Sequence, residues 1–183
     1  MNLKFNTKPI PFILCVCSGN MGRSPIMEAK LKQLLAERGL ADRVRIDSAG
    51  IQGTGGTAPP KFLRLADYPE GKIMLPLLAK RSLDITEHVY QPITEQLIKG
   101  TDVILIPSED IRSERPNALA KQFPQYRDKM ILLSELVGEH KDVPDFGDCF
   151  DQAVHKKALD MICDFTEEGF HRLCGLLGFR FGP

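Results

Sequence analysis

Residues 10–25 read IPFILCVCSGNMGRSP, an apolar run followed by a glycine-containing turn and a Ser-Pro pair. The first part of this stretch, from Ile10 to Val16, is an apolar run of strand length, which is typical of a strand buried on both faces of a parallel sheet. A turn containing glycines follows, and Ser24 and Pro25 then predict the start of a helix, with Ser24 as its N-cap. The stretch therefore predicts a strand, a tight loop and a helix in direct succession.

The rest of the chain continues this alternation of strands and helices. Three more short apolar runs predict strands, at Val44 to Asp47, Val103 to Ile106 and Met130 to Leu133. Helical patterns lie between or after them, at Ser24 to Gly39, Thr94 to Gly100, Asp110 to Phe123 and Phe150 to Leu177. We therefore expect an α/β fold, a doubly wound four-stranded parallel sheet with helices on both faces, in a single domain over residues 1–183.

The segment after the second predicted strand has a different composition. Gly, Thr and Pro dominate it as far as Pro60, which predicts a loop. From Lys61 to Arg81 we expect helical pieces that are broken around Pro69 and again at Pro76.

The composition excludes several classes of protein. Of the 183 residues, 43% are hydrophobic and 26% are charged, which is typical of a globular chain and excludes a disordered one. Lys and Arg number 24, as do Asp and Glu, so no excess positive charge indicates binding to nucleic acid or to a membrane. The longest uncharged stretch, Pro9 to Gly22, is too short to span a membrane. Five irregularly spaced cysteines favour reduced thiols and a cytoplasmic location.

The loop after the first predicted strand carries Cys17 and Arg23, six residues apart. Open α/β sheets bind ligands where a parallel strand ends and a helix begins, because the first N–H groups of the helix attract anions. A helix N-terminus and a nearby arginine also favour the nucleophilic thiolate form of a cysteine. The planar guanidinium of Arg23 can bind two phosphoryl oxygens, and Gly19 and Gly22 permit a tight loop with inward-pointing amides.

Simpler roles are open to the same residues. Cys15 lies in the middle of the predicted strand, so we expect it to pack in the core. Arg23 could be a surface charge, but a cation at the start of a helix opposes the helix dipole unless an anion compensates it. We therefore expect Cys17 to be a reactive thiol and Arg23 to be an anion ligand.

Residues 15–29, CVCSGNMGRSPIMEA, resemble the signature of the low molecular weight protein tyrosine phosphatase family. Further landmarks of that family follow in order across most of the chain: DSAG from Asp47, DITEH from Asp84, VILI from Val103 and VPDFG from Val143.

The resemblance implies a role for each residue of the loop. Cys17 would be the nucleophile and Arg23 would bind the phosphoryl group. The backbone amides of the loop would form the phosphate cradle, over Ser18, Gly19, Asn20, Met21 and Gly22. A polar network would brace the loop in position, formed by Asn20, Ser24, Ser48 and His88.

The chain departs from the family pattern close to this loop. Gly22 stands where the family usually has a second cysteine, able to protect the nucleophile as a disulfide. The Asp-Pro motif that supplies the family's general acid is here Asp145-Phe146. We expect Asp145 to be the general acid and Phe146 to flank an aryl substrate, although Asp145 could instead cap the next helix, as Asp148 could.

Three further departures lie elsewhere in the chain. Gln91 replaces an arginine, Pro107-Ser108 replaces a common Met-Asp, and residues 51–81 are longer than usual where the family shapes substrate entry.

These observations predict a phosphomonoester hydrolase, and specifically a protein-tyrosine phosphatase that forms a phosphocysteine on Cys17. Its substrate would be a phosphorylated protein or a small aryl phosphate, with no cofactor or metal, because Arg23 and the loop amides supply the positive field. Two alternatives stay open. The altered Asp145 loop would suit a phosphate-binding regulatory pseudophosphatase. The same scaffold also serves thioredoxin-coupled arsenate reductases, but these need resolving cysteines, and none occurs between Cys17 and Cys149.

One group of residues contains possible metal ligands. Cys149, His155 and Cys163 lie on or beside one predicted helix, but a zinc site there would need further ligands. We expect His155 to pair with Asp151, one helical turn earlier.

Overall fold

The computed structural model describes residues 10–179, which form one four-stranded parallel sheet. The strand order is β2-β1-β3-β4. The strands are β1 (Phe12–Cys17), β2 (Arg45–Gly50), β3 (Val103–Ile106) and β4 (Met130–Leu132).

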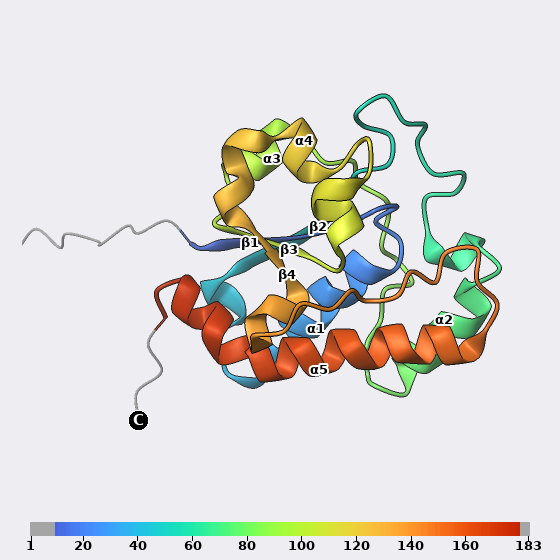
Figure 1. Ribbon diagram of the computed structural model, residues 1–183. Coiled ribbons are helices and arrows are strands. Elements are labelled where there is room, and N and C mark those ends of the chain that lie inside the picture. Colours follow the sequence, from blue (N-terminus) through green and yellow to red (C-terminus); the bar gives the residue numbers. More distant parts are fainter. Residues whose placement is uncertain (1–9, 180–183) are drawn as a thin grey trace, which may run out of the picture.

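Helices cover both faces of this sheet, as the sequence predicts (Figure 1). The α-helices are α1 (Arg23–Glu37), α2 (Gly71–Ala79), α3 (Glu95–Lys99), α4 (Leu119–Gln122) and α5 (Gln152–Leu176). α1, α2 and α5 pack on one face, and α3 and α4 pack on the other. Short 3-10 helices lie at Ala41–Arg43, Leu65–Asp67, Pro124–Lys129 and Leu133–Val137, and a π-helical turn lies at Asp110–Glu114. The doubly wound α/β class is therefore confirmed.

The central strands are apolar along their whole length because both of their faces are covered. In β1, Ile13 and Cys15 point into the core beneath α1 and α5, whereas Leu14 and Val16 point into the core beneath α3 and α4. β3 shows the same alternation, and all of its side chains are buried. The uninterrupted apolar run of β1 is thus explained by its place in the middle of the sheet.

One predicted helix start agrees with a side-chain cap and one does not. The Thr94 hydroxyl accepts the Leu97 N–H at 3.2 Å at the start of α3. Ser24, in contrast, does not cap α1, because the helix begins one residue earlier, at Arg23, and has no side-chain cap. The prediction for Ser24 is wrong because its hydroxyl is engaged with another partner, described below.

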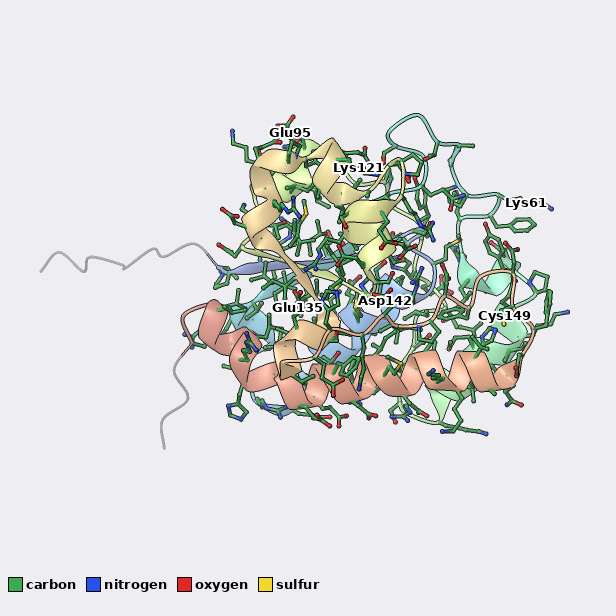
Figure 2. All side chains as sticks on the ribbon, viewed as in Figure 1. Lys61, Glu95, Lys121, Glu135, Asp142 and Cys149 are labelled. Carbon is green, nitrogen blue, oxygen red and sulfur yellow. The ribbon has the colours of Figure 1, made fainter. Side chains whose placement is uncertain are left out.

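The segment 51–81 is a loop followed by short helices, and it lies at the end of the sheet where β1 ends (Figure 1). Figure 2 shows Lys61 on the outer side of this segment. The predicted helix break at Pro76 is wrong, because Pro76 lies inside α2. Pro76 and Lys72 are both exposed, so the helical carbonyl that loses its partner can be hydrated. Within residues 10–179, no helix combines the length and the apolar character needed to cross a bilayer.

Candidate active site

Cys17 ends β1 and lines a cavity of about 480 Å³ at the carboxyl end of the sheet. Residues of the loop after β1, of segment 51–81 and of the loop before α5 form its walls. Within residues 10–179, the Cys17 sulfur accepts two hydrogen bonds, from the Asn20 N–H at 3.3 Å and from the Ser24 hydroxyl at 3.0 Å. Because both groups donate, they stabilise negative charge on the sulfur.

The loop between Cys17 and α1 presents backbone N–H groups that are available to bind a ligand. Several of its N–H groups make no hydrogen bond to any other group in residues 10–179, namely those of Ser18, Gly19, Met21, Gly22 and Arg23. Asn20 adopts a left-handed φ of 51°, which bends the chain around the sulfur. An anion in this loop would therefore meet uncommitted amides at the positive end of α1.

A buried polar network surrounds Asn20. Its side-chain amide donates to the Ser24 hydroxyl at 3.1 Å and to the Ser48 hydroxyl at 2.9 Å. Nε2 of His88 lies 2.8 Å from the Asn20 carbonyl oxygen, which can only accept, so this nitrogen carries the proton. Burial lowers the pKa of His88, which keeps the ring neutral. The structure thus brings together the four residues of the expected bracing network.

Two further residues join this network without having been anticipated. The Ser48 hydroxyl donates to the Glu28 carboxylate at 2.6 Å, and the Gln91 N–H donates to the Asn20 side-chain oxygen at 2.8 Å. Glu28 lies on α1, 20 residues before Ser48 in the sequence, so only the fold reveals the contact.

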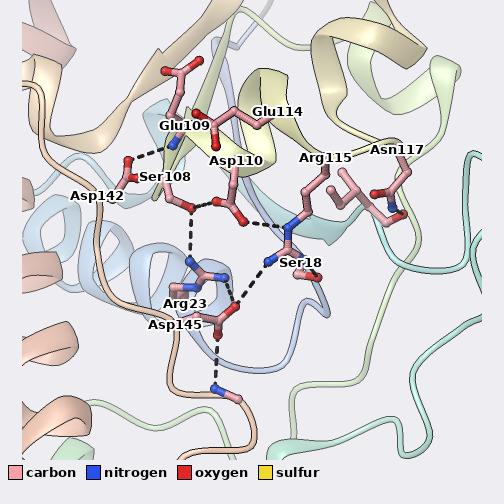
Figure 3. Close-up of polar contacts among 12 residues, drawn as sticks. Ser18, Arg23, Ser108, Glu109, Asp110, Glu114, Arg115, Asn117, Asp142 and Asp145 are labelled. Atoms are coloured by element: carbon pink, nitrogen blue, oxygen red, sulfur yellow. Dashed lines mark hydrogen bonds and ion pairs between the residues drawn. The ribbon is translucent and has the colours of Figure 1, made fainter.

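Arg23 and Asp145 meet in the same cavity (Figure 3). The Arg23 guanidinium is 4% exposed, and it donates to the Ser108 hydroxyl at 3.2 Å, to the Val143 carbonyl at 3.4 Å and to the Asp145 carboxylate. Asp145 also accepts the Gly147 N–H at 3.1 Å. Asp145 does not cap α5, because the side chain of Asp151 accepts the Ala153 N–H there, at 2.8 Å. The capping alternative for Asp145 is therefore wrong.

Phe146 explains the glycine at position 22. A Cβ atom on Gly22 would lie 2.3 Å from the Phe146 ring, so the ring occupies the space that a side chain at position 22 needs. Phe146 is buried, and its ring centroid lies 5.0 Å from that of His155. The Phe after Asp145 thus fills the space that a second cysteine before Arg23 would need, so the two departures from the family pattern are linked by packing.

His155 does not pair with Asp151 as predicted. Its ring is buried against Phe146, and Nε2 lies 2.7 Å from the Cys149 carbonyl oxygen. Asp151 is engaged in capping α5, which removes it from His155. Across residues 10–179, no three His, Cys, Asp or Glu side chains are grouped so that they could hold a metal ion.

Arg115 and Glu70 also line the cavity, and no sequence pattern points to either residue. Arg115 reaches the loop after β1 by donating to the Ser18 hydroxyl at 2.8 Å. Glu70 is buried; one carboxylate oxygen accepts the Asp148 N–H at 2.7 Å, and the other has no hydrogen-bond partner among the described residues. Both contacts join parts of the chain that are more than 70 residues apart, which local patterns do not show.

The family model for low molecular weight phosphotyrosine protein phosphatases matches residues 12–176. The chain belongs to this family. Among relatives of the phosphatase, a protein-arginine-phosphatase of Bacillus subtilis (strain 168) is 32% identical over 151 residues, or 81% of this chain and 87% of that protein. The low molecular weight protein-tyrosine-phosphatase Etp of Escherichia coli (strain K12) is 28% identical over 143 residues, or 78% of each chain.

Solved structures show the same relationship. The low molecular weight protein tyrosine phosphatase from T. tengcongensis superposes with a TM-score of 0.70 at 26% identity, covering 88% of this chain and 99% of that one. A mutant of the arginine phosphatase YwlE with a phosphorylated active-site serine gives a TM-score of 0.69 at 26% identity, covering 90% of this chain and 95% of that one. The phosphatase is thus an enzyme, a hydrolase of a family whose mechanism uses a cysteine.

Proposed function

We propose that this phosphatase removes phosphate from phosphotyrosine in proteins, by way of a phosphocysteine on Cys17. One observation carries the proposal: the Cys17 sulfur, with two hydrogen-bond donors, shares a cavity with the uncommitted amides of its loop, with Arg23 and with Asp145.

In the first step the Cys17 thiolate attacks the phosphorus atom, and the bond between phosphorus and the ester oxygen breaks. Asp145, protonated, gives its proton to the leaving phenolate oxygen. Asp145 has to release Arg23 to do this, because the two side chains form an ion pair in the structure. Arg23 and the loop amides then hold the phosphoryl oxygens.

In the second step water attacks the phosphorus of the phosphocysteine and the phosphorus–sulfur bond breaks. The Asp145 carboxylate takes a proton from this water, and the electron pair of the broken bond returns to the Cys17 sulfur. The hydroxyl of Ser24 stabilises the departing thiolate, because it donates to this sulfur.

The walls of the cavity suit an aromatic leaving group. Met21, Leu65 and Tyr68 line it beside the phosphate loop, and an aryl ring bound in the loop could pack against their apolar surfaces. We therefore favour phosphotyrosine over substrates whose phosphate is carried by a polar group, and we expect the enzyme to work in the cytoplasm.

The test is hydrolysis of matched phosphotyrosyl and phosphoarginyl peptides by the wild type, Cys17→Ser and Asp145→Asn, in reductant with EDTA. We expect turnover of the phosphotyrosyl peptide in EDTA, no turnover by Cys17→Ser, and a kcat roughly 10² to 10⁴-fold lower for Asp145→Asn. Preferred turnover of the phosphoarginyl peptide would contradict the substrate assignment. Full activity of Cys17→Ser would contradict the mechanism.

The same assay decides between the alternatives. Phosphotyrosine binding without turnover by the wild type would indicate a regulatory pseudophosphatase, and arsenate-dependent oxidation of thioredoxin would indicate an arsenate reductase.

A further inference from the structure

We propose that Arg115 is a second arginine of the phosphate site and binds the phosphoryl group together with Arg23. This inference rests on the proposed function and adds to it a binding residue that lies almost 100 positions from the phosphate loop.

The Arg115 guanidinium is held in place on two sides. Its Nε donates to the Asp110 carboxylate at 2.6 Å, and one terminal nitrogen donates to the Ser18 hydroxyl at 2.8 Å (Figure 3). Ser108 donates to Asp110 and accepts from Arg23, so one chain of hydrogen bonds fixes both arginines. Although burial alone would raise it, the pKa of Asp110 is lowered by its hydrogen bonds to Ser108 and Arg115, which keeps this anchor charged.

The remaining terminal nitrogen of Arg115 faces the cavity. It lies 3.7 Å from Oδ2 of Asp145, the same oxygen that contacts Arg23, and it makes no hydrogen bond in the described part of the chain. One carboxylate oxygen thus lies between two guanidinium groups. Its position shows that an anionic oxygen can be shared by both arginines.

A phosphoryl oxygen suits this position. When Asp145 moves to protonate the leaving group, both guanidinium groups lose this carboxylate, and a phosphoryl dianion can replace it. The side chain of Arg115 is 35% exposed, whereas that of Arg23 is 4% exposed. Arg115 can therefore be reached from the solvent side of the cavity, while Arg23 binds from its interior.

The experiment measures the Kd of inorganic phosphate by titration calorimetry for the wild type, Arg115→Gln and the matched control Arg112→Gln. Arg112 lies in the same segment but pairs with Glu109 and Glu135, outside the cavity. We expect Arg115→Gln to raise the Kd about 10-fold or more, and Arg112→Gln to leave it unchanged.

An unchanged Kd in a folded Arg115→Gln would overturn the proposal. Titration of the same variants with a phosphotyrosyl peptide that has acidic neighbours adds a second check. A loss of affinity confined to this peptide would also overturn the proposal, because Arg115 would then bind the peptide and not the phosphate. A crystal structure of the wild type with phosphate provides a check that does not depend on any variant: a hydrogen bond between Arg115 and phosphate supports the proposal, and its absence contradicts it. Because binding is measured without turnover, a failure of the catalytic proposal would be recognised separately.

Discussion

The environment of the sulfur, and not the residue type, separates Cys17 from Cys15 and Cys174. Cys15 lies two residues earlier on the same strand, where burial raises the pKa of its thiol well above the ordinary value. Burial likewise raises the pKa of Cys174 to about 11. Cys17 instead lines the cavity and accepts two hydrogen bonds. We therefore expect the thiol of Cys17 to be more reactive than those of Cys15 and Cys174.

Alkylation tests this difference directly. We expect iodoacetamide at neutral pH to modify Cys17, to leave Cys15 and Cys174 unmodified, and to be slowed at Cys17 by added phosphate, which would occupy the loop. Peptide mass spectrometry measures each site. Modification of Cys17 at the same rate with and without phosphate would contradict the placement of the anion.

A second prediction at the level of single residues concerns Ser24. Ser24→Ala removes the hydroxyl that donates to the Cys17 sulfur, so the thiolate becomes a poorer leaving group in the second step. A hydrogen bond to a charged group is worth about 1.5–3 kcal/mol, which corresponds to a roughly 10-fold or larger fall in the rate of phosphocysteine hydrolysis. Pre-steady-state kinetics should show a larger burst followed by slower turnover. Unchanged hydrolysis of the intermediate would contradict this role.

At the scale of elements, the loop before α5 is fitted to the loop after β1. The Phe146 ring lies against Gly22, and Glu70 at the start of α2 accepts the Asp148 N–H from the same loop. The loop that carries Asp145 is thus held from two sides, by packing and by a hydrogen bond. These contacts hold the loop at the position, 146, where the family usually has a proline.

A double-mutant cycle tests the fit between Gly22 and Phe146. Gly22→Ala should destabilise the fold, because its Cβ would overlap the buried ring, and overpacking of this kind typically costs about 1–3 kcal/mol. In a Phe146→Ala background the same substitution should cost little, since the space is then open. Urea unfolding gives the free energies. Additive effects of the two substitutions would show that the contact does not decide position 22.

At the scale of the whole molecule, His88 links the segment after α2 to the phosphate loop. Burial lowers its pKa in the folded state, so the unfolded chain binds a proton more readily than the folded chain does. Folding stability should therefore fall as the pH drops below about 6.5, the ordinary pKa of histidine, and on through the lower folded value. His88→Gln should show a weaker dependence on pH over this range. Thermal melts at pH 7 and pH 5 measure both, and equal shifts for the two proteins would contradict the assignment to His88.

How much of the molecule the sequence predicts depends on the range of the interactions. The strand, loop and helix from residue 10 onward follow from local patterns, and the predicted bounds of the buried central strand β3 match the observed ones. The prediction that Ser24 caps α1 is wrong because its hydroxyl bonds a sulfur seven positions away rather than a helical N–H. Local patterns do not reveal Arg115 and Glu70, because their partners lie 97 and 78 positions away and only the assembled fold brings them together.

Acid quenching of the enzyme during turnover of an aryl phosphate, followed by mass spectrometry of its peptides, tests the phosphocysteine mechanism. We predict a phosphoryl group on Cys17 that disappears when substrate is exhausted. Turnover of the substrate with no phosphoryl group ever found on Cys17 would contradict this mechanism.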